Sequence, residues 1–346
     1  MESERILGQN HILRHFENAI RMGKISHAYI INGEEGSGKM NLAIHFAKAL
    51  QCERNNSNKA INEDGERITV PGTACGQCKS CKQTDSKNQP DIKYITYEKS
   101  GIGVDEIREQ INDDIDIKPY SSPYKIYIVP ESEKMTVQAQ NALLKTIEEP
   151  PEYAIIILLT TNADTFLQTI LSRCVMLNIR PVKEDIIKNQ LTSQYGVGDY
   201  EARVAATFSN GNPGKAIKLA TSEEFKELKQ YVVGMFMSLE KGGRDIIGEA
   251  IKKTGTFKKQ IDEYFSLMRI WFRDILVYKA TKEEDQIIFQ DEYMTIEKMS
   301  QTYSFDDIND ILKAIDLAES RIKSNVNFDS TIEILLLSIK EKTSGK

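Results

Sequence analysis

The sequence lacks several features that would place it in a specialised class of protein. No apolar run is long enough to cross a bilayer, and no basic segment followed by an apolar one begins the chain. Positive charge is not in excess, since 45 Lys and Arg face 51 Asp and Glu and the formal net charge is -6. We therefore expect a soluble cytoplasmic protein that makes no membrane contact and has no extensive basic surface.

Cysteine is also scarce. The chain has five cysteines in 346 residues, and three of them lie between Cys75 and Cys81. A disulfide framework belongs to short secreted chains, so we do not expect one here. The crowding favours a metal site in a reducing compartment.

The N-terminal half has the pattern of an α/β domain. Short apolar runs alternate with loops and helical stretches, and a glycine-rich loop follows the first run. The sequence turns helical from about residue 180 almost to its end. Since single hydrophobic cores stop growing at about 250–300 residues, we expect two or three domains. The predicted strands are 26–32, 125–129, 154–159 and 175–179.

The glycine loop carries most of a phosphate-binding pattern, Gly33-x4-Gly38-Lys39, with Gly36 inside it. In such a loop, backbone N–H groups cradle phosphates and the lysine reaches the outer ones. The next residue should supply a hydroxyl to magnesium, but it is Met40, whose thioether is a poor ligand for a hard cation. We therefore expect a true or ancestral nucleotide loop that has lost one magnesium ligand.

A second magnesium ligand is missing as well. An aspartate is expected after the apolar strand 125–129, and Pro130 stands there instead. Glu131 keeps the position from which a carboxylate could polarise water. With neither Met40 nor Pro130 able to hold the metal, we expect ATP hydrolysis to be absent or very weak. Whether ATP or ADP still binds through Lys39 and the loop stays open.

The cysteines form a set of four, because Cys52 can join Cys75, Cys78 and Cys81. Four thiolates suit a tetrahedral structural zinc ion, which can stabilise a loop-rich insertion, here at about residues 52–81. An iron–sulfur cluster is the chemical alternative, but Asp85 stands where the bacterial ferredoxin pattern needs a cysteine. Unligated thiols are the other alternative. Zinc is the favoured ion.

Several motifs resemble those of the AAA+ clamp-loader ATPases of bacterial DNA polymerase III. The most specific is Ala-Gln-Asn-Ala-Leu-Leu-Lys-Thr-Ile-Glu-Glu-Pro-Pro at residues 139–151, which is similar to the helix after the second nucleotide motif. The resemblance spans roughly residues 5–180. Its other parts are Ile6-Leu7-Gly8-Gln9 on the adenine side, His27-Ala28-Tyr29, the first sensor Thr161-Asn162, the finger motif Ser172-Arg173-Cys174, and the second-sensor segment Gly211-Asn212-Pro213-Gly214-Lys215.

The resemblance implies a fold and a site residue. It implies an AAA+ nucleotide-binding-like domain at 1–180 with a four-cysteine zinc module, a helical lid at 181–222, and a helical collar through which subunits oligomerise at 223–346. It also implies that Arg173 is an arginine finger that completes the ATP site of a neighbouring subunit. A permanently charged planar guanidinium suits charge developing on a transferring phosphoryl group.

The gamma and tau motor subunits keep both magnesium motifs. This chain departs from both, and in this it is similar to delta-prime subunits. The resemblance thus implies a non-catalytic subunit of the DNA polymerase III holoenzyme, with gamma or tau motors and a delta subunit as neighbours. Through the complex it would act with the sliding clamp and primer-template DNA. Two alternatives stay open: an active motor ATPase with an altered magnesium shell, and a zinc-dependent nucleic-acid-binding module.

Overall fold

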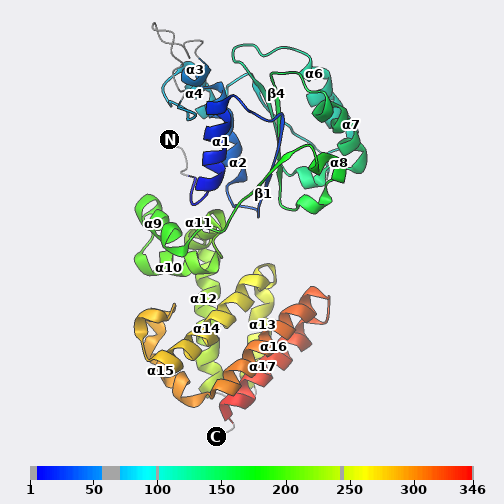
Figure 1. Cartoon of the computed structure of the whole chain (residues 1–346). Helices are drawn as coiled ribbons and strands as arrows, with labels where there is room; N and C mark the ends of the chain where they lie inside the picture. The colour runs from blue at the N-terminus through cyan, green and yellow to red at the C-terminus, as the bar shows by residue number, and fades with distance from the viewer. Residues whose placement is uncertain (1–5, 57–70, 99–100, 242–244, 345–346) are drawn as a thin grey trace. The chain divides into compact units, whose positions relative to one another are not determined.

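The chain divides into two compact units, which are described separately (Figure 1). The computed structural model describes residues 6–56, 71–98, 101–241 and 245–344. Unit 1 comprises Met1–Ile187 with Asn210–Lys215, and unit 2 comprises Lys188–Ser209 with Ala216–Lys346. Much of the polar stretch between Cys52 and Cys75 lies outside the described residues. The division into three domains at residues 180 and 222 stays a prediction.

A parallel five-stranded sheet forms the centre of unit 1, with strand order β2-β3-β4-β1-β5. Every residue of β3 and β4 is buried, as expected for nearly continuous apolar strands that are covered on both faces. The predicted α/β class is therefore confirmed. The strands are β1 Ala28–Asn32, β2 Ile92–Tyr94, β3 Lys125–Val129, β4 Ala154–Thr160 and β5 Val175–Asn178.

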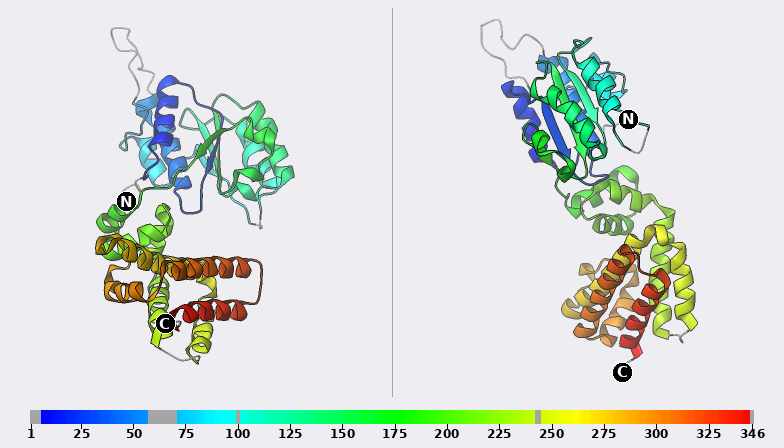
Figure 2. Two further views of the ribbon diagram at one scale, coloured as in Figure 1. Left: turned by 60° about the horizontal axis from the view of Figure 1, so that its bottom comes forward. Right: turned by 90° about the vertical axis from the view of Figure 1, so that its right-hand side faces the viewer.

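Helices pack on both faces of this sheet (Figure 2). Helices α1 and α2 cover one face, where the rings of Phe16 and Phe46 stack at 4.0 Å between centroids. Helices α5 to α8 cover the other face, where Leu143 and Ile170 are fully buried. The helices of unit 1 are α1 Asn10–Met22, α2 Lys39–Gln51, α3 Glu53–Asn56, α4 Lys79–Asp85, α5 Val104–Ile107, α6 Asp113–Ile115, α7 Val137–Glu148 and α8 Gln168–Leu171.

The carboxyl ends of the parallel strands gather the predicted nucleotide motifs at one edge of the sheet. The glycine loop follows β1, Pro130 and Glu131 follow β3, and Thr161 follows β4. Arg180 comes shortly after β5. Ligands of open parallel sheets bind at this edge, so the fold places the candidate site there.

Unit 2 is helical. Trp271 is fully buried and stacks on Phe236, with 5.6 Å between ring centroids. Asp274 is also buried, and its carboxylate accepts the backbone N–H groups of Ile288 and Phe289. Among the described residues, none of the helices combines the length and the apolar character that a bilayer crossing requires. Of the later helices, α9 and α11 begin in unit 1. The later helices are α9 Glu184–Tyr195, α10 Asp199–Phe208, α11 Pro213–Thr221, α12 Glu223–Lys241, α13 Asp245–Thr256, α14 Ile261–Thr281, α15 Tyr293–Thr302, α16 Phe305–Lys323 and α17 Phe328–Ser344.

Candidate functional site: a glycine loop, an exposed arginine and a four-cysteine cluster

The glycine loop joins β1 to α2, as the sequence predicts. Gly38 is the N-cap of α2 and has φ of 93°, a left-handed conformation that favours glycine. The helix therefore begins at Lys39 and directs its first N–H groups toward the loop, which is the arrangement that binds phosphate in nucleotide-binding proteins.

The Lys39 side chain folds back on its own loop. Its Nζ donates to the carbonyl oxygen of Gly33 at 2.5 Å and to that of Glu34 at 2.8 Å. Burial lowers the pKa of Lys39, and the nearby carboxylates of Glu133, Glu35 and Glu34 partly offset this. Two carbonyl oxygens of the loop thus accept the hydrogen bonds of the Lys39 ammonium group.

The magnesium positions are occupied by apolar groups. Met40 is half-buried and packs against the hydrophobic cluster of α1, α2 and the sheet. Pro130 follows the last residue of β3 and offers no side-chain oxygen. The two residues predicted to have lost metal ligands therefore contribute no hard ligand at this edge.

Glu131 is engaged by two neighbours. Its carboxylate accepts from Lys134 Nζ at 2.9 Å and from the hydroxyl of Tyr97. These hydrogen bonds, chiefly that of Tyr97, lower the pKa of Glu131. Nearby, Thr161 of the first sensor donates to Glu133 Oε1 at 2.7 Å. The Glu131 carboxylate, which could polarise water, therefore accepts hydrogen bonds from Tyr97 and Lys134.

The segment Asn210–Lys215 packs on the glycine loop within unit 1. The N–H of Gly214 donates to the Gly36 carbonyl at 3.1 Å, and Asn212 Nδ2 donates to the Glu35 carbonyl at 2.7 Å. A Cβ at Gly214 would lie 2.5 Å from the Gly36 oxygen, so only glycine permits this approach. The sequence predicted a second-sensor segment here but not its direct backbone bond to the loop.

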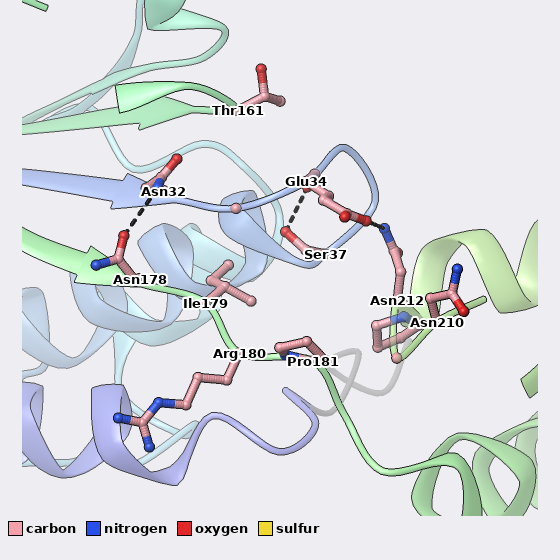
Figure 3. A pocket seen from close by; sticks show the side chains of 13 residues that line it. Asn32, Glu34, Ser37, Thr161, Asn178, Ile179, Arg180, Pro181, Asn210 and Asn212 are labelled. Atoms are coloured by element: carbon pink, nitrogen blue, oxygen red, sulfur yellow. Dashed lines mark hydrogen bonds between the residues drawn. The ribbon is translucent and has the colours of Figure 1, made fainter. Parts of the chain in front are cut away.

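A cavity of about 260 Å³ lies beside the loop (Figure 3). Asn32 and Asn178 on its wall are joined by a hydrogen bond of 3.0 Å, and the Asn32 Oδ1 atom is buried without a partner in the described residues. Gln9, which the sequence predicts to lie on the adenine side, exchanges two hydrogen bonds with the backbone of Arg180, at 2.7 and 3.0 Å. The lining residues are Asn32, Gly33, Glu34, Ser37, Thr161, Asn178, Ile179, Arg180, Pro181, Asn210, Gly211, Asn212 and Pro213.

Arg173 lies apart from these residues, between α8 and β5, and its side chain is exposed. The guanidinium forms an ion pair of 2.9 Å with Glu148, the last residue of α7. It also donates to the carbonyl of Thr169 and to the hydroxyl of Ser172. Its neighbour Cys174 is half-buried, and burial raises the pKa of that thiol to about 12.

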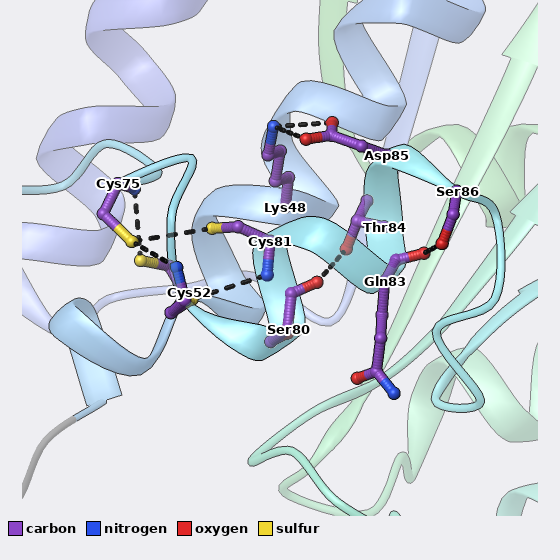
Figure 4. Close-up of polar contacts among 10 residues, drawn as sticks. Lys48, Cys52, Cys75, Ser80, Cys81, Gln83, Thr84, Asp85 and Ser86 are labelled. Atoms are coloured by element: carbon purple, nitrogen blue, oxygen red, sulfur yellow. Dashed lines mark hydrogen bonds and ion pairs between the residues drawn. The ribbon is translucent and has the colours of Figure 1, made fainter.

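The structure brings the four predicted cysteines together (Figure 4). Cys52 ends α2, Cys78 caps α4 and Cys81 lies on α4, while Cys75 comes from the preceding loop. Their four Sγ atoms all lie within 4.8 Å of one another. Backbone N–H groups of Cys75, Cys78 and Cys81 each donate to the Sγ of the preceding cysteine of the set, at 3.3 to 3.4 Å.

This geometry suits a structural metal ion. In a tetrahedral site with metal–sulfur bonds of about 2.3 Å, the sulfurs are separated by about 3.8 Å. Cys75 Sγ and Cys81 Sγ are 3.9 Å apart. Backbone N–H groups lower the pKa of Cys75 to about 6, whereas burial raises that of Cys81. Asp85 takes no part in the cluster, because Lys48 pairs with its carboxylate at 2.6 Å.

Comparisons with known proteins agree with these features. A family model described as DNA polymerase III, delta subunit, matches residues 8–183, and one described as DNA polymerase III, delta subunit, C terminal, matches residues 248–341. The chain is 26% identical over 337 residues to DNA polymerase III subunit delta′ of Bacillus subtilis, which covers 96% of each protein.

Two further similarities cover less of the chain or have a lower sequence identity. DNA polymerase III subunit tau of B. subtilis is 34% identical over 221 residues, which are 62% of this chain and 36% of that protein. A solved gamma-subunit-related protein of Thermotoga maritima is 20% identical, with a TM-score of 0.40 and coverage of 96% of this chain and 99% of that one. From the two family matches and the full-length similarity to a delta′ subunit, the chain belongs to the family of DNA polymerase III delta′ subunits, within the AAA+ clamp loaders.

Proposed function

We propose that this delta′-type subunit does not turn over ATP itself and instead supplies Arg173 to the ATP site of a neighbouring subunit. Its role would be to help load the sliding clamp onto primed DNA during chromosomal replication. The observation that carries the proposal is the combination of an exposed arginine at the predicted finger position with Met40 and Pro130 at the two predicted magnesium positions.

The loss of magnesium ligands argues against hydrolysis by this chain. Magnesium bridges the β- and γ-phosphates and neutralises the charge that develops during transfer. A thioether and a proline ring cannot replace a hydroxyl and a carboxylate in that shell. Lys39 and Glu131 form hydrogen bonds within their own domain, and neither is a magnesium ligand of the expected type.

The chemistry of arginine supports its role in trans. Its guanidinium is always charged and presents a planar fork of donors that matches phosphate oxygens. Arg173 follows α8 at an exposed position, and Gly33, Gly36, Gly38 and Lys39 of its own chain form a separate site. A finger supplied by one subunit to another contributes on the order of 10³–10⁵ in rate.

We propose that the cysteine cluster holds zinc, with Cys52, Cys75, Cys78 and Cys81 as ligands. The set offers four thiolates and no carboxylate or water position, which is typical of a structural zinc site rather than a catalytic one. When bound, the ion would join the end of α2 to α4 and so stabilise the packing of these two helices.

The proposed partners are the motor subunits of the gamma and tau type and a delta subunit, with the clamp and primer-template DNA reached through the complex, in the cytoplasm. Proteins named tau and gamma are among the relatives of this chain. The experiment is steady-state ATP hydrolysis by the purified chain and by the assembled complex. Turnover only in the complex supports the proposal, whereas magnesium-dependent turnover by the chain alone, lost in Lys39→Ala, would show an active motor.

A further inference from the structure

The Arg173 guanidinium is restrained within its own chain. Its Nη2 lies 2.9 Å from Glu148 Oε1, and its Nη1 donates to the Thr169 carbonyl at 3.1 Å and to Ser172 Oγ at 3.3 Å. Three acceptors, one of them charged, therefore hold the side chain against the ends of α7 and α8. To bind a phosphate outside the domain, the guanidinium has to break its contacts with these three acceptors.

Glu148 is an unusual residue for its position. It is the last residue of α7, and a helix C-terminus carries a partial negative charge that disfavours a carboxylate. Pro150 and Pro151 prevent the helix from continuing past this point. The positive charge of Arg173 compensates both the carboxylate and the helix end, so the two side chains stabilise each other's position.

We propose that Glu148 is a positioning residue, which holds the Arg173 finger back in the free chain and releases it when the γ-phosphate of ATP on a neighbouring subunit competes for the guanidinium. This inference rests on the proposed function of Arg173. The carboxylate of Glu148 and a phosphate are competing anions for the same planar donors. In a complex whose neighbouring site holds no ATP, Arg173 would then stay ordered against Glu148.

The strength of the contact suits a releasable restraint. The side chains of Arg173 and Glu148 are 40% and 45% exposed, so solvent screens their attraction. Breaking an exposed ion pair of this kind shifts an equilibrium by about 1.4- to 5-fold. A phosphate with more than one negative charge can overcome such a pair, whereas a buried pair would hold the finger permanently.

The first test observes the free chain and needs no partner. Arginine side-chain N–H signals of the ¹⁵N-labelled protein report on local order, and the Arg173 signal is identified by its loss in Arg173→Lys. We expect an ordered signal in the wild type, a more mobile one in Glu148→Gln, and wild-type behaviour in Glu149→Gln, whose carboxylate is exposed and makes no ion pair within the described residues. Equal mobility in all three proteins would overturn the inference.

The second test is a double-mutant cycle on the ATPase of the assembled complex. Glu148→Gln should raise kcat/KM for ATP by about 1.4- to 5-fold, with no change in the Arg173→Ala background and none from Glu149→Gln. A rise that persists in the Arg173→Ala background would mean a structural effect and would overturn the inference.

The two proposals fail in different ways. If Arg173→Ala leaves the rate of the complex unchanged, Arg173 is not a finger and both proposals fall. If Arg173→Ala lowers the rate while Glu148→Gln does not raise it, the finger stands and the restraint by Glu148 is wrong.

Discussion

The backbone N–H of Gly214 donates a 3.1 Å hydrogen bond to the carbonyl oxygen of Gly36, which joins the second-sensor segment to the middle of the glycine loop. Asn212 strengthens the contact through the Glu35 carbonyl and, through its Oδ1, accepts the N–H of Lys215. The loop is therefore stabilised by hydrogen bonds from a segment that is distant in the sequence.

Gly214→Ala should destabilise the chain. Its new Cβ would lie 2.5 Å from the Gly36 oxygen, so the segment would have to move and lose its hydrogen bonds. We expect a loss of about 1–3 kcal/mol in the free energy of unfolding, measured by urea denaturation. Gly248→Ala is the control, because its Cβ meets nothing within 4 Å and should be neutral or stabilising by up to about 1 kcal/mol. Equal effects of the two variants would contradict the close approach.

Asp114→Asn should weaken unit 1 in a pH-dependent way. Asp114 is partly buried, which raises its pKa, but hydrogen bonds from Lys93, Lys125 and Tyr127 outweigh this and lower it. A lowered pKa in the folded state means stability that is complete above the ordinary aspartate pKa of about 3.9 and is lost as the pH falls through the folded value. Lys125 is buried, so it would lose its ion pair of 2.9 Å in the variant.

We expect Asp114→Asn to cost about 2–3 kcal/mol at pH 7 and progressively less below about pH 4. Unfolding by urea at pH 7, 5 and 3 measures this trend. Asp113→Asn, on the exposed side of the same turn, should change stability by no more than about 0.5 kcal/mol. A cost for Asp114→Asn that does not change with pH would rule out the ion pair as its cause.

Removal of a cluster cysteine should release the metal. We expect about one zinc ion for each wild-type chain purified under reducing conditions, measured by elemental analysis. Cys75→Ser should lower the zinc content and the melting temperature, because only three thiolates remain to hold the ion. Cys174→Ser, which alters a thiol outside the cluster, should keep the zinc. A metal-free wild-type chain with the same melting temperature as Cys75→Ser would refute a structural zinc site.

Restoring the missing ligands should restore magnesium-dependent binding of ATP. The double variant Met40→Thr with Pro130→Asp regains a hydroxyl and a carboxylate at the two metal positions, and we expect its affinity for ATP with magnesium to rise at least about tenfold. Calorimetry with and without magnesium measures this. Met40→Leu, which keeps the apolar packing of Met40, is the control and should bind as the wild type does. Wild-type binding that already depends strongly on magnesium would show that the metal shell is intact.

Much of unit 1 could be predicted from sequence, because buried parallel strands and a glycine loop leave strong local signals. The strand Lys125–Val129 was predicted with its observed bounds, and the strand predicted at 175–179 ends one residue beyond β5. Strand β2 was missed, since its three residues include a lysine and form no apolar run. The cysteine spacing was sufficient to identify all four residues whose sulfur atoms converge.

Contacts between segments that are distant in the sequence could not be predicted from the local sequence pattern. The bond between Gly36 and Gly214 depends on two loops meeting in the folded chain, and nothing in either local sequence specifies it. The same holds for Arg173 and Glu148, which come from separate motifs. Tyr97 and Lys134 both donate to Glu131 and also contact each other, and only the fold brings Tyr97 to this place. The local sequence pattern thus predicted the strands, the loop and the cysteines of the site. It did not predict the hydrogen bonds and ion pairs that hold the side chains in place.

The central claim is most directly tested by the clamp- and DNA-stimulated ATPase of the complex, assembled with wild-type chain, with Arg173→Ala, or with Arg14→Ala, an exposed arginine on α1, as the control. We predict that the complex with Arg173→Ala loses the turnover of the site next to this chain, where a finger contributes on the order of 10³–10⁵, while Arg14→Ala keeps the full rate. The same stimulated rate with Arg173→Ala as with the wild type would contradict the account.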